Sequence, residues 1–247
     1  MATLSELVQG LTPARVFSPR AGVSLATSDW LQLRADHAFA RDAVFSTLHF
    51  SLVFPPHMVE RLQLFEVFSQ AQSRQEYLLN PVLGRSLSPQ DRTRVLQLCP
   101  ARPRLQIFLG DGLSPAALTL QGSALLQELW NLASLQGWAM GRPFLVHQAR
   151  VGLLNEVGHL LEPEVAILLI GERPGLSTVE SLSAYMAYRP TLGDTDASRN
   201  LISNIHSRGV GLGQAAQRIV ALAAAMLANQ TSGVGLKERS SLPAPGV

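Results

Sequence analysis

Short apolar runs separated by turn residues dominate the second half of the chain. One of them, Val165 to Ile170, contains no polar residue and is rich in branched side chains. This length and composition are typical of a strand buried on both faces of a sheet. Similar runs, each bounded by turn residues, predict further strands at Leu105 to Leu109, Pro143 to His147 and Ser183 to Tyr188.

Helix signals lie between these runs. Ser114-Pro115 supplies a cap and a proline at the first helical position, and Gly137 ends the helix that they begin. Helical spacing also predicts helices from Asn155 to Leu161 and from Gln214 to Gln230. Strands that alternate with helices are typical of a parallel sheet covered by helices. We therefore expect an α/β fold over residues 103–233, Rossmann-like, with a mainly parallel sheet flanked by helices.

The first 102 residues form a smaller region that is mostly helical or irregular, and we expect it to contact another subunit. Thr27-Ser28-Asp29 predicts the cap of an amphipathic helix that continues to Phe45. Ser88-Pro89 predicts the start of a second helix that ends at Leu98. Periodicity does not decide whether residues 59–68 form a helix or a strand.

Two composition changes mark the ends of the α/β region. Pro100 to Pro103 is the predicted domain boundary on the N-terminal side. The stretch 234–247 is rich in Gly, Ser and Pro, so we expect a flexible tail there. The sequence therefore predicts three parts, 1–102, 103–233 and 234–247.

Composition and charge mainly exclude function classes. A chain of 247 residues that is 47% hydrophobic can bury a normal core. Its net charge is only +2, and no Lys/Arg run alternates with aromatic residues, so we expect no nucleic-acid partner. The single cysteine, Cys99, allows no internal disulfide and fits an intracellular compartment. No apolar stretch approaches the roughly 20 residues of a membrane span, and no signal peptide is evident.

Familiar catalytic motifs are absent from the sequence. It contains no Walker A motif, no HExxH and no GxSxG, and its six histidines are scattered without the spacing of metal ligands. Gly209-Val210-Gly211-Leu212-Gly213 resembles a dinucleotide loop. However, no strand is predicted before it and the third glycine of GxGxxG is missing, which favours a flexible helix-entry loop. We expect neither a catalytic set nor a metal site in this chain.

Charged residues at predicted strand ends are the remaining candidates. Glu172 and Arg173 come just after Gly171, at the end of the apolar run 165–170, and ligands of open α/β sheets bind where strands end. The alternative is an exposed charged pair of little energetic value. Asp111 leaves another predicted strand within Gly-Asp-Gly, where bonding to its own turn is favoured over a ligand contact. The stretch 200–206, NLISNIH, is interpreted as a capped turn that leads into the last helix. Glu172 is the best site candidate.

Several longer motifs together resemble the small subunit (light chain) of ethanolamine ammonia-lyase. They are GDGLSPAAL (110–118), ILLIGERPGLSTVESLSAYMAYRP (167–190) and ISNIH (202–206). The resemblance continues into TPARVFSPRAG (12–22) and ADHAFARDAV (35–44). No single motif is diagnostic, but their order and spacing are, over almost the whole chain.

This resemblance implies a cofactor, a partner and three site residues. The family acts in the adenosylcobalamin-dependent conversion of ethanolamine to acetaldehyde and ammonia, and a large subunit carries the ethanolamine site. The light chain contributes one wall of the cobalamin site. The family's cobalamin contacts fall on Val151, Glu172 and Leu201, the last of which replaces a cysteine usual in the family.

The resemblance also implies where and how the protein works. It places the protein in the bacterial cytoplasm and leaves open whether a bacterial microcompartment encloses it. Because the Asp-x-His-x-x-Gly signature is missing, cobalamin is expected to bind with its own lower base still on cobalt. The isolated chain is expected to be inactive. Two alternatives stay open: a stand-alone Rossmann-like nucleotide- or ligand-binding enzyme, and a non-catalytic assembly subunit.

Overall fold

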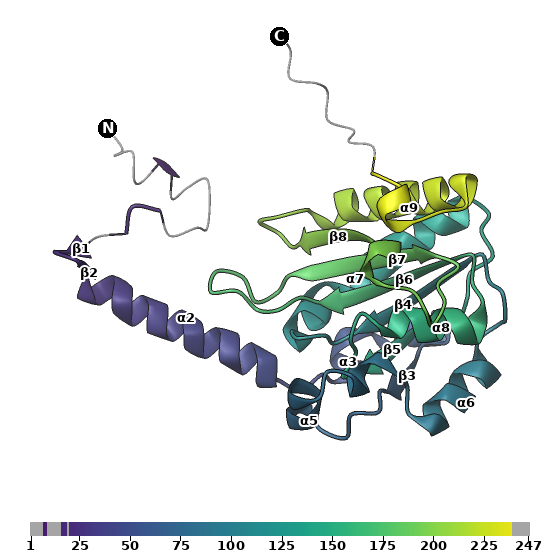
Figure 1. The fold of residues 1–247 in the computed structure, drawn as a ribbon, viewed down its shortest axis with the longest axis horizontal. Coiled ribbons are helices and arrows are strands. Elements are labelled where there is room, and N and C mark those ends of the chain that lie inside the picture. Colours follow the sequence, from purple (N-terminus) through teal and green to yellow (C-terminus); the bar gives the residue numbers. More distant parts are fainter. Residues whose placement is uncertain (1–6, 9–15, 19, 239–247) are drawn as a thin grey trace, which may run out of the picture.

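A sheet of six strands forms the centre of the structure, a computed structural model that describes residues 7–8, 16–18 and 20–238 (Figure 1). The strand order is β3-β5-β4-β6-β7-β8. The strands are β3 (Phe65–Phe68), β4 (Leu105–Gly110), β5 (Phe144–His147), β6 (Val165–Gly171), β7 (Leu182–Tyr188) and β8 (Asn200–Ile205).

The sheet is mixed, so the expectation of a mainly parallel sheet was wrong. Strands β3, β5, β4 and β6 pair in parallel, whereas β7 runs antiparallel to both β6 and β8. A parallel neighbour requires a crossover of about a dozen or more residues, usually a helix. Residues 172–181, which join β6 to β7, contain no helix, so the chain turns back beside β6. The fold is α/β, and its Rossmann-like class stays a prediction.

Alternate residues of the central strands enter two different cores. Ile167 of β6 packs on the side of α7 (Pro115–Leu135) and α9 (Leu212–Asn229). Its neighbour Leu168 packs on the other side, with α8 (Leu153–Leu161). Both side chains are fully buried. The unbroken apolar run in β6 follows from this arrangement, because neither face of the strand meets water.

The predicted helix starts in this region are confirmed. Ser114 Oγ accepts a hydrogen bond from Ala117 N at 3.3 Å at the beginning of α7. Ser88 Oγ accepts one from Asp91 N at 3.1 Å at the beginning of α6 (Pro89–Leu98). In both helices a proline follows the capping serine. Proline suits this position because the N–H that it lacks would have no partner within the helix.

Two strands of the six-stranded sheet, β3 and β8, were not predicted. The ambiguous stretch 59–68 contains both elements, because α4 (Pro56–Leu62) ends there and β3 follows. The stretch 200–206, expected to be a capped turn, forms β8 instead. Ile202 and Ile205 of β8 enter the core beside α9, whereas Leu201 stays exposed. A strand at the edge of a sheet, half exposed and rich in polar residues, lacks the apolar signal of a buried strand.

Helix α2 (Thr27–Phe45) projects away from the body of the protein (Figure 1). Its span matches the prediction, but Thr27 is already helical and no side chain caps its start, so that detail was wrong. Ala43 is its one buried residue. Exposed apolar side chains line the helix: Trp30, Leu31, Phe39 and Phe45. A short hairpin, β1 (Arg20–Ala21) and β2 (Ser24–Leu25), precedes it.

Short elements complete the fold: α3 (Phe50–Val53), α5 (Arg74–Leu79), η1 (Leu83–Arg85), η2 (Asp196–Ser198) and η3 (Gly233–Gly235). Because β3 pairs with β5, the sheet extends across the predicted boundary at residues 100–103. Within the described ranges, no helix has the length and apolar character needed to cross a membrane.

Both ends of the outer strand β8 carry additional contacts. At its first residue, the Asn200 side chain accepts a hydrogen bond from Gly233 N at 2.6 Å and donates one to Leu236 O at 2.7 Å. At its last residues, Val210 N donates to Asn204 O at 2.8 Å and bridges to Ile205. The first part of the predicted tail is thus fixed to the sheet, and residues 239–247 lie outside the described residues.

Candidate functional site

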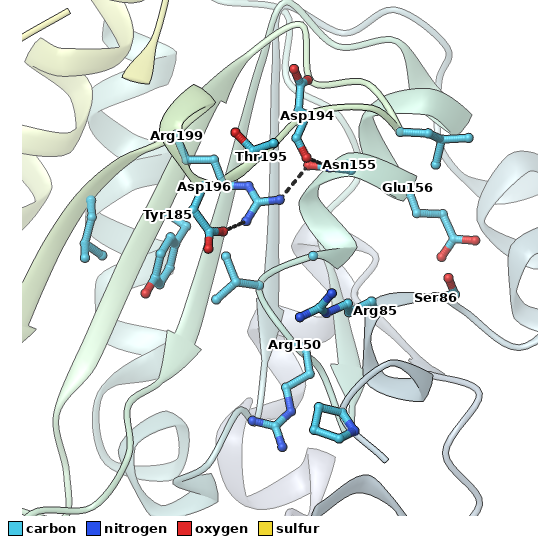
Figure 2. Close-up of a pocket in the computed structure, with 15 residues that line it drawn as sticks. Arg85, Ser86, Arg150, Asn155, Glu156, Tyr185, Asp194, Thr195, Asp196 and Arg199 are labelled. Carbon is cyan, nitrogen blue, oxygen red and sulfur yellow. Dashed lines mark hydrogen bonds and ion pairs between the residues drawn. The ribbon is translucent and has the colours of Figure 1, made fainter. Parts of the chain in front are cut away.

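Two of the three predicted site residues line one cavity. Val151 lies in the turn between β5 and α8, and Leu201 lies in β8, yet both contribute to a cavity of about 880 Å³ (Figure 2). The cavity lies on the α8 side of the sheet, because Leu201 pairs through Tyr185 with Leu168, which belongs to that core. Its walls come from η1, the β5–α8 turn, α8, β7, the segment before β8 and β8 itself.

Glu172 lies beside this cavity rather than in its lining. Its Oε1 accepts hydrogen bonds from Ser183 Oγ at 2.6 Å and from Asn204 N at 2.8 Å. The carboxylate therefore ties the exit of β6 to both β7 and β8. Arg173 is exposed, and the two residues form no ion pair in the part of the chain that the structure describes, so the charged-pair alternative was wrong. Asn204, whose N–H makes this bond, has a φ of 60°, in the left-handed region that asparagine tolerates better than most residues.

Tyr185 is a cavity residue that the sequence analysis missed. It lies in β7 on the same face as Ser183 and pairs with Leu201 across the sheet. Burial raises the pKa of Tyr185, as do the negative charges of Glu172 and Asp196, while Arg199 opposes the shift. The phenol is therefore protonated at neutral pH and offers a hydrogen-bond donor. Tyr185 is partly exposed between buried Ala184 and Met186, but the residues around it carry no sequence signal that could have identified this.

The carboxylates that line the cavity already have partners. Asp196 pairs with Arg199 at 2.5 Å, and Arg199 also donates to Asn155 Oδ1 at 2.9 Å. Glu156 is buried, pairs with Arg92 and accepts a hydrogen bond from Leu87 N at 2.5 Å. Asp194 accepts from Thr191 N at 2.6 Å. These groups fix the walls of the cavity and leave no acid–base pair free for chemistry.

Asp111 plays a structural role different from the predicted one. It does not bond its own turn; its Oδ1 accepts a hydrogen bond from Ala149 N at 2.9 Å, and its Oδ2 pairs with Arg74 at 3.2 Å. Burial raises the pKa of Asp111, and Arg74 and the Ala149 amide oppose that shift. The turn itself depends on Gly112, whose φ is +57°. Asp111 therefore joins the ends of β4 and β5 to α5.

The glycine-rich stretch 209–213 is a helix entry. Strand β8 does precede it, contrary to the sequence prediction, but Gly211 is the N-cap of α9 and Val210 bonds back to the strand. Within the described residues no group of three or more His, Cys, Asp or Glu side chains could hold a metal ion. Cys99 is buried, and burial raises the pKa of its thiol to about 12.

Comparison with known proteins identifies the family. Residues 3–237 match the family described as ethanolamine ammonia-lyase light chain (EutC). The ethanolamine ammonia-lyase small subunit of Rhodopseudomonas palustris (strain BisA53) is 41% identical over 234 residues, covering 95% of this chain and 90% of the relative. The small subunit from Clostridium acetobutylicum is 37% identical over 234 residues, covering 95% and 94%. The predicted family is thus confirmed: the chain belongs to the ethanolamine ammonia-lyase light chain family.

Proposed function

We propose that this chain is the light chain of an adenosylcobalamin-dependent ethanolamine ammonia-lyase, which converts ethanolamine to acetaldehyde and ammonia together with a large subunit. The observation that carries this proposal is the convergence of Val151 and Leu201 on one cavity, with Glu172 beside it. These residues come from distant parts of the chain. The substrate site belongs to the large subunit, and this chain supplies one wall of the cobalamin site.

The chemistry of the cavity suits a corrinoid. The periphery of the corrin carries amide side chains, which both donate and accept hydrogen bonds. Tyr185 and the arginines of the cavity offer donors, Glu172 offers an acceptor, and Val151 and Leu201 offer apolar contact. When bound, the cofactor supplies the homolytic cleavage of its cobalt–carbon bond. The chain then has only to bind and orient it, in agreement with the lack of a free acid–base pair.

Helix α2 supports the proposed partner. Trp30 and Phe39 are 48% and 64% exposed on a helix that buries only one residue against the body of the protein. An apolar surface of this kind marks contact with another protein. We infer that the large subunit covers it. The bacterial cytoplasm is the proposed location, and enclosure in a microcompartment is left open.

Co-expression with large subunits encoded nearby tests the function. We expect the two chains to elute together and to turn over ethanolamine when adenosylcobalamin is added, whereas this chain alone is inactive. A stand-alone enzyme would instead show activity without the large subunit. A pure assembly subunit would associate without changing the cobalamin affinity of the large subunit. Separate elution at micromolar concentration would contradict the proposal.

Replacing Glu172 by alanine is expected to weaken cobalamin binding to the complex by about tenfold to a hundredfold, or about 1–3 kcal/mol. Oε1 is occupied by Ser183 and Asn204, but Oε2 has no partner among the described residues and can accept from a corrin amide. Glu172→Gln keeps one acceptor oxygen and should lose less. Titration of cobalamin monitored by absorbance provides the measurement.

A control separates the contact from the local fold. Ser183→Ala removes one partner of Oε1 and keeps the carboxylate, so its cobalamin affinity should stay within about threefold of wild type. Equal affinities of wild type and Glu172→Ala would remove the side chain from the site. An equal loss in Ser183→Ala and Glu172→Ala would assign Glu172 to the support of β7 instead.

A further inference from the structure

Two arginines of the cavity lack a negative partner. Arg85 ends η1 and Arg150 precedes the β5–α8 turn, and Figure 2 shows both in the same part of the cavity. The lining carboxylates Glu156 and Asp196 pair with other arginines, Arg92 and Arg199. Among the described residues, Arg85 and Arg150 form no ion pair. The third lining carboxylate, Asp194, accepts hydrogen bonds from Thr191 and pairs with neither arginine, so Arg85 and Arg150 each lack a paired negative charge within the described ranges.

The side chain of Arg150 is held in position although one of its donors has no acceptor. Its guanidinium stacks on Tyr77, with the carbon 4.2 Å from the ring centroid, and Nη2 donates to Tyr77 O at 3.2 Å. Its Nε is buried and has no hydrogen-bond partner. An orphaned buried donor is costly and uncommon in native proteins, so the hydrogen-bonding capacity of this guanidinium is not used up by the protein.

The two arginine-bearing loops fit against each other through glycines. Arg150 N donates to Gly84 O at 2.7 Å, and a Cβ on Gly84 would lie 2.7 Å from Arg150 Cγ. Likewise, a Cβ on Gly152 would lie 2.8 Å from Arg85 Cγ. Each arginine thus packs on the glycine of the opposite loop. The absence of side chains at both glycines is what lets the two arginine-bearing loops approach each other, on either side of Val151, so that both arginines line the same cavity.

We propose that Arg85 and Arg150 form an anion subsite that binds the phosphodiester of the cobalamin nucleotide loop. This rests on the proposed function. The peripheral side chains of cobalamin are neutral amides apart from that one phosphodiester, so the nucleotide loop carries the anion that matches two unpaired guanidinium groups. Guanidinium N–H groups bind phosphate oxygens with short, charge-assisted hydrogen bonds. The subsite would select complete cobalamin over corrinoids that lack the loop.

The test compares two corrinoids on the complex of light and large subunits. Cyanocobalamin contains the phosphodiester, whereas dicyanocobinamide lacks the whole nucleotide loop. We expect Arg150→Gln to weaken binding of cyanocobalamin by about tenfold to a hundredfold and to leave binding of dicyanocobinamide within about twofold. Arg85→Gln should show the same selectivity with a smaller loss, because Arg85 is more exposed. Absorbance titration or calorimetry measures both affinities.

Matched variants make the result decisive. Arg102→Gln removes the same charge from an exposed pair with Glu162, outside the cavity, and should change neither affinity. If Arg150→Gln disrupts the complex, the comparison of the two corrinoids is made with Arg85→Gln instead. Arg85 does not stack on Tyr77, so its replacement removes no such packing contact. An equal loss for both corrinoids, or no loss for either, would overturn the subsite. Failure of the wild-type complex to bind either corrinoid would instead refute the proposed function.

Discussion

Asp111→Asn is expected to lower the free energy of unfolding by about 3–5 kcal/mol, the range measured when one partner of a buried ion pair is removed. The Asp111 side chain is only 5% exposed and lies 3.2 Å from that of Arg74, which is 15% exposed. Arg74 Nη2 already lacks a partner. Asparagine keeps the shape and the bond from Ala149 N but leaves the guanidinium buried without its counter-charge. Denaturant unfolding of the isolated chain measures the loss.

An exposed ion pair provides the control for Asp111. Glu162→Gln disrupts the pair with Arg102, in which the two side chains are 59% and 77% exposed. Solvent screens such a pair, so the expected loss is under about 1 kcal/mol. If Asp111→Asn lost no more stability than Glu162→Gln, Asp111 would be protonated in the folded protein. Its contact with Arg74 would then not be an ion pair.

Gly171→Ala is expected to cost about 3 kcal/mol of stability, at the upper end of the range for overpacking a core. Gly171 is the last residue of β6, and a Cβ there would overlap the carbonyl oxygens of Ser114 and Asp111. These are main-chain atoms of the turn that joins β4 to α7, which cannot rotate away as a side chain could. The turn would have to move away from the end of β6. Thermal or denaturant unfolding is the measurement.

Gly213→Ala is the matching control, because nothing lies within 4 Å of a Cβ at that position in α9. Alanine is favoured over glycine in a helix by about 1 kcal/mol, so this variant should be as stable as wild type or more so. If Gly171→Ala were equally harmless, the close approach of the β4–α7 turn to the end of β6 would not be a constraint on the fold.

The sequence predicted the centre of the sheet better than its margins. Buried strands such as β4 and β6 can be recognised in the sequence, because burial on both faces favours apolar residues at almost every position. The direction of β7 was not predictable from its own residues, since periodicity is the same in parallel and antiparallel strands. Strand β8 was missed because only Ile202 and Ile205 enter the core, which is too little for a pattern. Pairing with β7 supplies the rest of its stability.

The site was predictable only in part and mostly from the family resemblance. Glu172 stood out physically, as a carboxylate at the end of a buried strand. The residues around Val151 and Leu201 contain no pattern that predicts that the two line one cavity. Tyr185 and Arg150 were missed for a related reason. Their roles depend on contacts with η1 and β8, which are far away in the sequence and which local patterns do not encode.

The contacts at the two ends of β8 bear on how the protein avoids self-association. A free outer strand offers unpaired N–H and C=O groups to which a strand of another molecule can add. In this protein, the segment around Leu236, which Asn200 binds, lies beside the first end of β8. Val210 forms a bridge with Ile205 at the other end. At the opposite margin, β3 is short and Phe68 O accepts from Ser88 N at 2.9 Å. Fibril-like stacking through the sheet margins is thus hindered, and association is directed to side-chain surfaces such as α2.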